Sequence, residues 1–199
     1  MRSKNPPNHK THCFRCYQRL EICICSMIPT IWTRVEFLIL RHIFEAERPS
    51  NTGRFVALTM PNSRIISCGG GKRIGLPCIQ TGFLRAPGTW LLWPDGTGTP
   101  HEAMDKSSIK RVVVIDATWR QARRLYSSVS LLWSMPRIIL PEPDFQKKRL
   151  RKQYRPGHMS TLEAVAAAVA AFEGSETAKP LEALYDELVR RRNSLRGKR

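Results

Sequence analysis

The stretch 111–124 (RVVVIDATWRQARR) places the strongest constraint on what this chain can fold into. Residues 112–115 form a continuous β-branched run, which is typical of a strand that is buried on both faces. A helical pattern of apolar and basic residues follows within the same stretch. Asp116 stands between the two halves, at the C-terminal end of the strand, and ligands bind at this edge of open α/β sheets. Asp116 is therefore a candidate for chemistry, and the alternative is that it only caps the helix.

Other apolar segments have the length and composition of core strands and alternate with helical patterns. The predicted strands are 35–40, 64–67, 90–93 and 136–140. The predicted helices cover 55–58, 162–172 before Gly174, and a last segment that starts at Pro180. Strands that alternate with helices predict an α/β fold, with a mainly parallel sheet and flanking helices.

The charge of the chain indicates a polyanionic partner. Lys and Arg number 33 against 16 acidic residues, which gives a formal net charge of +17. The excess is clustered, because six of the nine residues 147–155 are basic. Nucleic acid is the partner that such clustering favours over a generally basic protein. No apolar run approaches the ~20 residues that span a bilayer, and no secretory leader is visible, so we expect a cytoplasmic protein.

Four cysteines near the N-terminus have the spacing of a metal site. Cys13, Cys16, Cys23 and Cys25 follow one another as C-x-x-C and C-x-C within 13 residues. Four thiolates suit a structural Zn²⁺, because they leave no open coordination position for catalysis. Disulfides or unrelated buried cysteines are the alternatives. We expect a disordered leader at 1–12, a zinc knuckle at 13–30 and a main domain at 31–195.

Polar segments follow three predicted strands and could converge on one cleft. The segment after Leu40 contains groups that grip anions or sugars: Arg48, Asn51, Thr52 and Arg54. A turn-rich segment follows Trp93, and Asp116 follows the central strand. Before the helix at 162–172, Ser160 and Glu163 form a capping box, so Thr161 and Glu163 either face a site or serve only the helix end.

Five motifs in this order resemble the DTW-domain family of tRNA-uridine aminocarboxypropyltransferases. They are the cysteine pattern at 13–25, RHxxExxRPxNTGR at 41–54, LxWPDG near 92–96, IDATWRQAR at 115–123 and RPGHMSTLEAVA at 155–166. The resemblance covers about residues 13–190. It implies a SPOUT-like fold with a C-terminal trefoil knot, S-adenosylmethionine (SAM) as co-substrate and tRNA as partner. The implied reaction transfers the 3-amino-3-carboxypropyl group of SAM to N3 of a tRNA uridine.

The resemblance, with the position of each residue, assigns expected roles. The expected catalytic residues are Asp116, Thr118 and Trp119, with Asp116 as the base that takes the N3 proton and Trp119 either stacking on a base or packing in the core. The expected SAM-binding residues are Leu92, Trp93, Pro94, Asp95, Gly96, Ile115, Leu140, Ser160, Thr161 and Glu163. The expected RNA-binding residues are Arg48, Asn51, Thr52, Arg54, Arg120, Arg123, Arg151 and Arg155.

Two other functions fit part of the pattern. A SAM-dependent SPOUT-like RNA methyltransferase would use the same cofactor and attack its methyl carbon. A non-enzymatic zinc RNA-binding protein would bind RNA without SAM. The carboxylates at Asp95 and Asp116 argue against simple RNA binding, because carboxylates repel phosphate.

Overall fold

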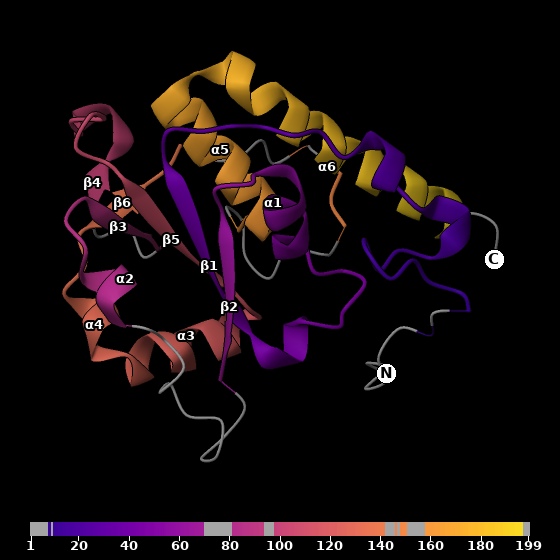
Figure 1. The fold of residues 1–199 in the computed structure, drawn as a ribbon, viewed down its shortest axis with the longest axis horizontal. Helices are drawn as coiled ribbons and strands as arrows, with labels where there is room; N and C mark the ends of the chain where they lie inside the picture. The colour runs from indigo at the N-terminus through magenta and orange to yellow at the C-terminus, as the bar shows by residue number, and fades with distance from the viewer. Residues whose placement is uncertain are drawn as a thin grey trace.

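A six-stranded parallel sheet forms the centre of the computed structural model, which describes residues 8, 10–69, 81–93, 98–141, 146, 148–150 and 158–196 (Figure 1). The strand order is β2-β1-β5-β3-β6-β4, and every pairing between neighbours is parallel. The strands are β1 (Glu36–His42), β2 (Arg64–Cys68), β3 (Thr89–Leu92), β4 (Thr99–Pro100), β5 (Arg111–Asp116) and β6 (Arg137–Ile139). The predicted α/β fold with a mainly parallel sheet is confirmed.

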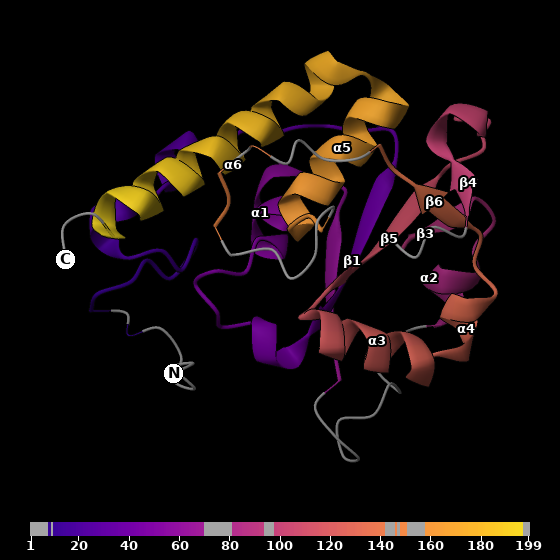
Figure 2. The same ribbon diagram turned by 180° about the vertical axis from the view of Figure 1, so that it is seen from behind.

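Helices cover both faces of this sheet. They are α1 (Gly53–Thr59), α2 (Thr81–Arg85), α3 (Trp119–Ser128), α4 (Ser130–Trp133), α5 (Thr161–Glu173) and α6 (Ser175–Arg196). Helices α1, α5 and α6 lie on one side, and α2, α3 and α4 lie on the other (Figures 1 and 2). None of the helices in the described part of the chain is long and apolar enough to cross a membrane.

Strand β1 shows why the central strands read as continuous apolar runs. Side chains alternate between the two faces of a strand, so Phe37 and Ile39 pack toward α1, α5 and α6, while Leu38 and Leu40 pack toward α3 and α4. All four are at most 1% exposed. A strand buried on both faces has no solvent face that would require polar residues.

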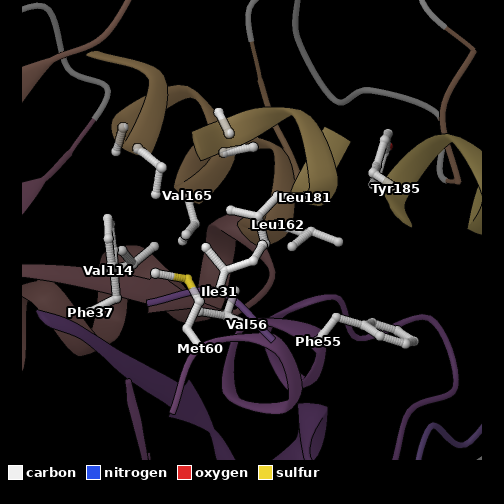
Figure 3. Packing of buried hydrophobic residues seen from close by; sticks show 14 of the residues in the cluster. Ile31, Phe37, Phe55, Val56, Met60, Val114, Leu162, Val165, Leu181 and Tyr185 are labelled. Atoms are coloured by element: carbon white, nitrogen blue, oxygen red, sulfur yellow. The ribbon is translucent and has the colours of Figure 1, made fainter. Parts of the chain in front are cut away.

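The first of these two cores joins the sheet to the C-terminal helices. Figure 3 shows Phe37 and Val114 of the sheet packing against Val165 of α5, with Val56 of α1 and Met60, which follows α1, completing the layer. Helix α5 begins at the predicted capping box and ends at Gly174, whose φ of +95° favours glycine.

Two local features differ from the expectations drawn from the sequence. Helix α6 begins at Ser175, five residues before Pro180, so the proline lies inside the helix near its start. The two-residue strand β4 was not expected, since it is too short to leave a pattern. The leader at 1–12 stays a prediction, because most of it lies outside the described residues; His12 pairs with Arg19 in an isolated antiparallel bridge.

The cysteine segment belongs to the same hydrophobic core as the main domain. Cys16, Ile24 and Ile31 are buried in the cluster that contains α1, α5 and α6. The segment also lies beside the C-terminal end of α6 (Figures 1 and 2), where the Arg191 guanidinium donates to the Cys23 carbonyl. The domain boundary near residue 30 stays a prediction.

Candidate active site and metal centre

Asp116 is a buried carboxylate at the carboxyl edge of the sheet, held by two neutral donors. It is 5% exposed. Asn51 Nδ2 donates to its Oδ2 at 2.5 Å, and Thr161 Oγ1 donates to its Oδ1 at 2.6 Å. These bonds compensate the removal of a charge from water. They also fix the plane of the carboxylate, which leaves its remaining lone pairs in defined directions.

Asp116 does not cap the helix that follows it. Thr118 is the N-cap of α3: its Oγ1 accepts from Gln121 N at 3.4 Å, and the Gln121 side chain accepts from Thr118 N at 2.9 Å. This capping box satisfies the start of α3 without the aspartate. Of the two interpretations of Asp116, chemistry or helix capping, capping does not apply, because Thr118 is the N-cap of α3.

The loop that follows β1 brings Asn51 and Thr52 to Asp116. Asn51 is 2% exposed, and its Oδ1 accepts from Arg54 N at 3.1 Å, so one amide both accepts from the first turn of α1 and holds the aspartate. Thr52 Oγ1 accepts from Leu162 N at 3.3 Å, which ties the start of α1 to the start of α5. The side chains of Asn51 and Thr52 are both buried and hydrogen-bonded inside the protein. Neither lies on an open surface that could face RNA.

Glycine is required at position 53 because α1 starts directly against Asp116. A Cβ built on Gly53 would lie 2.7 Å from Asp116 Cγ, closer than real Cβ atoms come to a neighbour. Only a residue without a side chain lets the first turn of α1 approach the carboxylate this closely.

At the start of α5, the expected SAM-binding residues face different neighbours. Thr161 contacts Asp116, as described above. Glu163 completes the capping box with Ser160 and accepts from Arg149 Nε at 2.9 Å, in an ion pair whose side chains are 9% and 8% exposed. Glu163 also raises the pKa of Tyr185, after the larger effect of burial. Glu163 therefore stabilises the C-terminal helices, while Thr161 belongs to the Asp116 cluster.

Trp119 lies in a row of aromatic rings beside this cluster. Its ring stacks on His158 with a centroid distance of 3.9 Å, and lies 6.3 Å from the ring of Trp93. Trp93 in turn stacks on Tyr126 at 4.6 Å. Trp119 is half-buried, so one ring face is covered by His158 and the side chain is not part of the deep core.

The strand ends expected to line the SAM pocket meet at one edge of the sheet. Leu92 of β3 pairs with Val114 of β5 and Ile138 of β6. Ile115 is therefore near the end of β5, and Leu140 lies just beyond the end of β6, at the same edge of the sheet. Pro94, Asp95 and Gly96 lie outside the described residues. Of the three polar segments, two are therefore observed to converge, after β1 and after β5.

The expected RNA-binding arginines are divided between the surface and the interior. Arg120 and Arg123 are exposed on α3, and Arg48 forms a salt bridge with the buried Glu45 at 2.5 Å. Arg151 and Arg155 lie outside the described residues.

Arg54 has a structural position and does not lie on an open surface. It is 7% exposed and donates to the carbonyls of Cys16, Arg48 and Ala46. Its guanidinium also lies 3.6 Å from the centre of the Tyr17 ring. Burial lowers the pKa of Arg54 to about 10. Arg54 thus anchors the cysteine segment against α1, and a role in binding RNA would require it to leave these partners.

The four cysteines converge as their spacing predicts. The Sγ atoms of Cys13, Cys16, Cys23 and Cys25 all lie within 4.8 Å of one another, so the group could hold a metal ion. The closest pairs are Cys13–Cys25 at 3.5 Å and Cys16–Cys23 at 3.7 Å, and all four are free thiols, which excludes the disulfide alternative in this structure.

The electrostatics of this cluster suit a cation. Burial and then hydrogen bonds among the thiols raise the pKa of Cys25 well above its ordinary value, and burial raises that of Cys16. The pKa of Cys13 falls to about 7 despite burial, because backbone N–H groups of Cys16 and Arg15 stabilise its thiolate. Four crowded thiols cannot all ionise unless a positive charge lies among them, and a divalent metal supplies that charge.

Several residues of the site escaped prediction. Gly53 lay inside a quoted motif, but nothing in the sequence showed that it would contact Asp116. Gln121 follows Thr118 at the T-x-x-Q spacing of a capping box, so the sequence carried a local signal for this contact. Tyr17 has a φ of 58°, unusual for a residue with a side chain, and it stacks on Arg54. The sequence signals the contact between Tyr17 and Arg54 only by the aromatic residue that follows Cys16.

Comparison with known proteins supports one family. Residues 10–193 match the family described as the DTW domain. The tRNA-uridine aminocarboxypropyltransferase 2 of Drosophila melanogaster is 29% identical over 86% of this chain and 70% of its own length. The tRNA-uridine aminocarboxypropyltransferase A of Arabidopsis thaliana is 25% identical over 96% of this chain and 84% of its own length. The mouse tRNA-uridine aminocarboxypropyltransferase 2 is 25% identical over 88% of this chain and 62% of its own length.

No solved structure matches the chain. The family match covers nearly the whole described fold, including the cysteine segment, the Asp116 cluster and α5. The chain therefore belongs to the DTW-domain family.

Proposed function

We propose that this protein is a tRNA-uridine aminocarboxypropyltransferase that uses SAM as donor. The observation that carries the proposal is the similarity to relatives of that name across 86% to 96% of the chain. The buried Asp116, held at the carboxyl edge of a parallel sheet, supplies a group that such a reaction needs.

The chemistry requires one proton acceptor and accurate orientation. N3 of the uridine loses its proton to the Asp116 carboxylate and forms a bond to the γ-carbon of the aminocarboxypropyl group. The bond between that carbon and the sulfonium breaks, its electron pair stays on sulfur, and 5′-methylthioadenosine leaves as a neutral thioether. Because the sulfonium is already activated, the enzyme contributes the deprotonation and the choice of which carbon meets N3.

Asn51 and Thr161 serve this step by holding the carboxylate. Both are donors, so they stabilise the ionised form that accepts a proton and fix the direction of the remaining lone pairs. Trp119 lies next to this cluster, and we expect its ring, in exchange for His158 or together with it, to stack on the uridine or on the adenine of SAM.

The SAM pocket is expected at the ends of β3, β5 and β6. Backbone groups at Leu92, Trp93, Ile115 and Leu140 lie along that edge, and Ser160 and Thr161 close it from the start of α5. Leu140 directly follows β6, and Thr161 at the start of α5 contacts Asp116 on β5. Strand β3 lies between β5 and β6 in the sheet. These positions of the described residues are compatible with the trefoil knot of SPOUT proteins, which we include in the proposal.

The RNA partner is expected on the basic surface. Arg120 and Arg123 are exposed on the helix that begins at Trp119, so they stand where phosphates beside a bound uridine would lie. We expect Arg151 and Arg155 to add to this surface. The protein is expected to act in the cytoplasm.

The cysteine cluster is expected to hold Zn²⁺. Its four thiolates would fill a tetrahedral site, and the ion would supply structural stability to the segment 13–25 and take no part in the transfer. Through Arg54, this segment supports the loop that carries Asn51.

Doubly labelled SAM tests the proposal. The purified protein is incubated with tRNA and with SAM that carries one label in its carboxyl carbon and another in its methyl group. We expect the carboxyl label in tRNA and the methyl label in 5′-methylthioadenosine. Methyl label in tRNA would indicate a methyltransferase, and calorimetry that detects RNA binding without SAM binding would indicate a non-enzymatic RNA-binding protein.

A further inference from the structure

A pocket of about 280 Å³ lies between the cysteine segment and the C-terminal end of α6. None of the residues with an expected catalytic, SAM-binding or metal-binding role lines it. The lining includes His12, Gln18, Arg19, Pro49, Arg192 and Leu195. Figures 1 and 2 show this end of α6 beside the N-terminal segment. Three parts of the chain that are distant in sequence therefore build one cavity.

The wall of the pocket is fixed by buried hydrogen bonds. Gln18 is 2% exposed, its Nε2 donates to the Pro49 carbonyl at 2.7 Å, and its Oε1 accepts from Arg192 Nε at 2.9 Å. One amide therefore joins the cysteine segment to the loop before α1 and to α6. Arg192 is held with its guanidinium at the pocket, and such a preorganised cation loses less freedom when it binds an anion.

The charge around the pocket favours an anion. Arg192 and Arg19 line it, and Lys10 and Arg15 are exposed in the same segment. Glu21 is the acidic residue of residues 10–30, and it pairs with Arg19 on the surface at 2.9 Å. The local excess of positive charge is complementary to a phosphate backbone.

The same segment displays an aromatic ring to solvent. Phe14 is 79% exposed, between Cys13 and Cys16, whose places in the thiol cluster fix both ends of its loop. Exposed aromatic rings beside cations are the surface on which unpaired bases stack. A largely exposed ring on a loop whose ends are fixed by the cluster gives this surface a base-binding element.

The pocket is also close to Asp116. Pro49 lines it, and Asn51, two residues further along, donates to Asp116. Two residues span at most about 7 Å along the chain. An RNA strand in the pocket would therefore lie within a few nucleotides of the expected position of the reacting uridine.

We propose that the pocket binds unpaired nucleotides of the substrate RNA, with phosphate at Arg192 and Arg19 and a base stacked on Phe14. The proposal rests on the proposed function and extends it to the part of the RNA that the enzyme recognises. The pocket selects uridines that have single-stranded neighbours, because paired bases cannot stack on a protein side chain.

Two variants, Phe14→Ala and Arg192→Gln, test the inference. For each, we measure the affinity for fluorescein-labelled pentauridine and the rate of aminocarboxypropyl transfer to tRNA. The matched control is Arg190→Gln, which removes the same charge from the same helix but lies roughly 200° around it from Arg192. Arg190 pairs with Glu187 on the surface. Thermal unfolding and zinc content are measured for every variant, and Arg19→Gln replaces Arg192→Gln if the latter loses stability.

We expect Phe14→Ala to weaken pentauridine binding at least about fivefold. Arg192→Gln should reduce the salt dependence of binding by about one phosphate contact. Both should raise the KM for tRNA and leave SAM affinity unchanged, and duplex RNA should compete poorly. The inference would be overturned if the pocket variants bound pentauridine with the same affinity as Arg190→Gln. It would also be overturned if duplex RNA competed as well as single-stranded RNA. A wild type that binds pentauridine through these residues but transfers nothing would overturn the proposed function alone.

Discussion

Asn51 Nδ2 lies 2.5 Å from Asp116 Oδ2 and joins the loop after β1 to the end of β5. The same amide accepts from Arg54 N, and the Arg54 guanidinium donates to the Cys16 carbonyl. A continuous series of contacts therefore runs from the thiol cluster to the carboxylate. It connects the proposed metal site to the carboxylate that we propose as the proton acceptor.

The donors to Asp116 are expected to control the transfer rate. Thr161→Val removes a hydrogen bond to a charged group, and we expect kcat to fall by about ten- to a hundredfold. Thr161→Ser retains the hydroxyl and should retain most of the activity. Single-turnover transfer to tRNA measures both variants. Equal rates for the valine and serine variants would show that this hydroxyl has no role in the reaction.

Arg54 is expected to matter for stability more than for RNA affinity. Lysine cannot reach three carbonyls and stack on Tyr17 at once, so Arg54→Lys should lower the free energy of unfolding by about 2 to 4 kcal/mol. Arg124→Lys, at an exposed position of α3, is the control and should change it by less than about 0.5 kcal/mol. Urea unfolding measures the difference, and similar values for the two variants would contradict the structural role.

One zinc ion per chain is expected in the thiol cluster. Cys16→Ser should reduce the bound zinc and lower the thermal midpoint, because the fully buried Cys16 belongs to both the cluster and the hydrophobic core. Cys68→Ser changes a buried cysteine outside the cluster and should leave the zinc content unchanged. Elemental analysis of the purified proteins decides this, and wild-type protein without zinc would contradict the assignment.

His42 is expected to make the fold sensitive to mild acid. Burial and then the charge of Arg48 lower the pKa of His42 below its ordinary value of 6.5. Below about pH 6.5, His42 of the unfolded chain takes up a proton, while the same imidazole in the folded protein resists it. The contribution of His42 to the free energy of unfolding is therefore fully present above this pH and is lost as the pH decreases.

His42→Asn is expected to remove this dependence, since an amide oxygen can replace the Nδ1 that accepts from Phe44 N. Chemical unfolding at several pH values between 7.5 and 5 should therefore show a smaller loss of stability for the variant than for the wild type. The same loss in both proteins would rule out His42 as its source.

The sequence predicted the sheet well because its signal is local. The run at 112–115 is apolar on both faces, and this is what burial between two helical layers requires. The cysteine cluster was predicted for a similar reason, since four ligands within 13 residues have few ways to be arranged. The capping box at Ser160 and Glu163 also depends only on neighbouring residues.

The parts that were not predicted depend on contacts between distant segments. Nothing local to Arg54 shows that its guanidinium lies under the cysteine segment and not on the surface. Gly53 is necessary because of Asp116, which is 63 positions away. Pro180 suggested a helix start, but the helix begins earlier because the residues before it continue directly from Gly174.

The rate of aminocarboxypropyl transfer by Asp116→Asn tests the central claim most directly. Asparagine keeps the size of the side chain and can still accept from Asn51, while the Thr161 hydroxyl can reverse and accept from the new amide. We predict that the single-turnover rate at saturating SAM falls by about 10²- to 10⁴-fold, with folding and SAM affinity retained. A rate within about twofold of the wild type would contradict the role of Asp116 as the group that accepts the uridine proton.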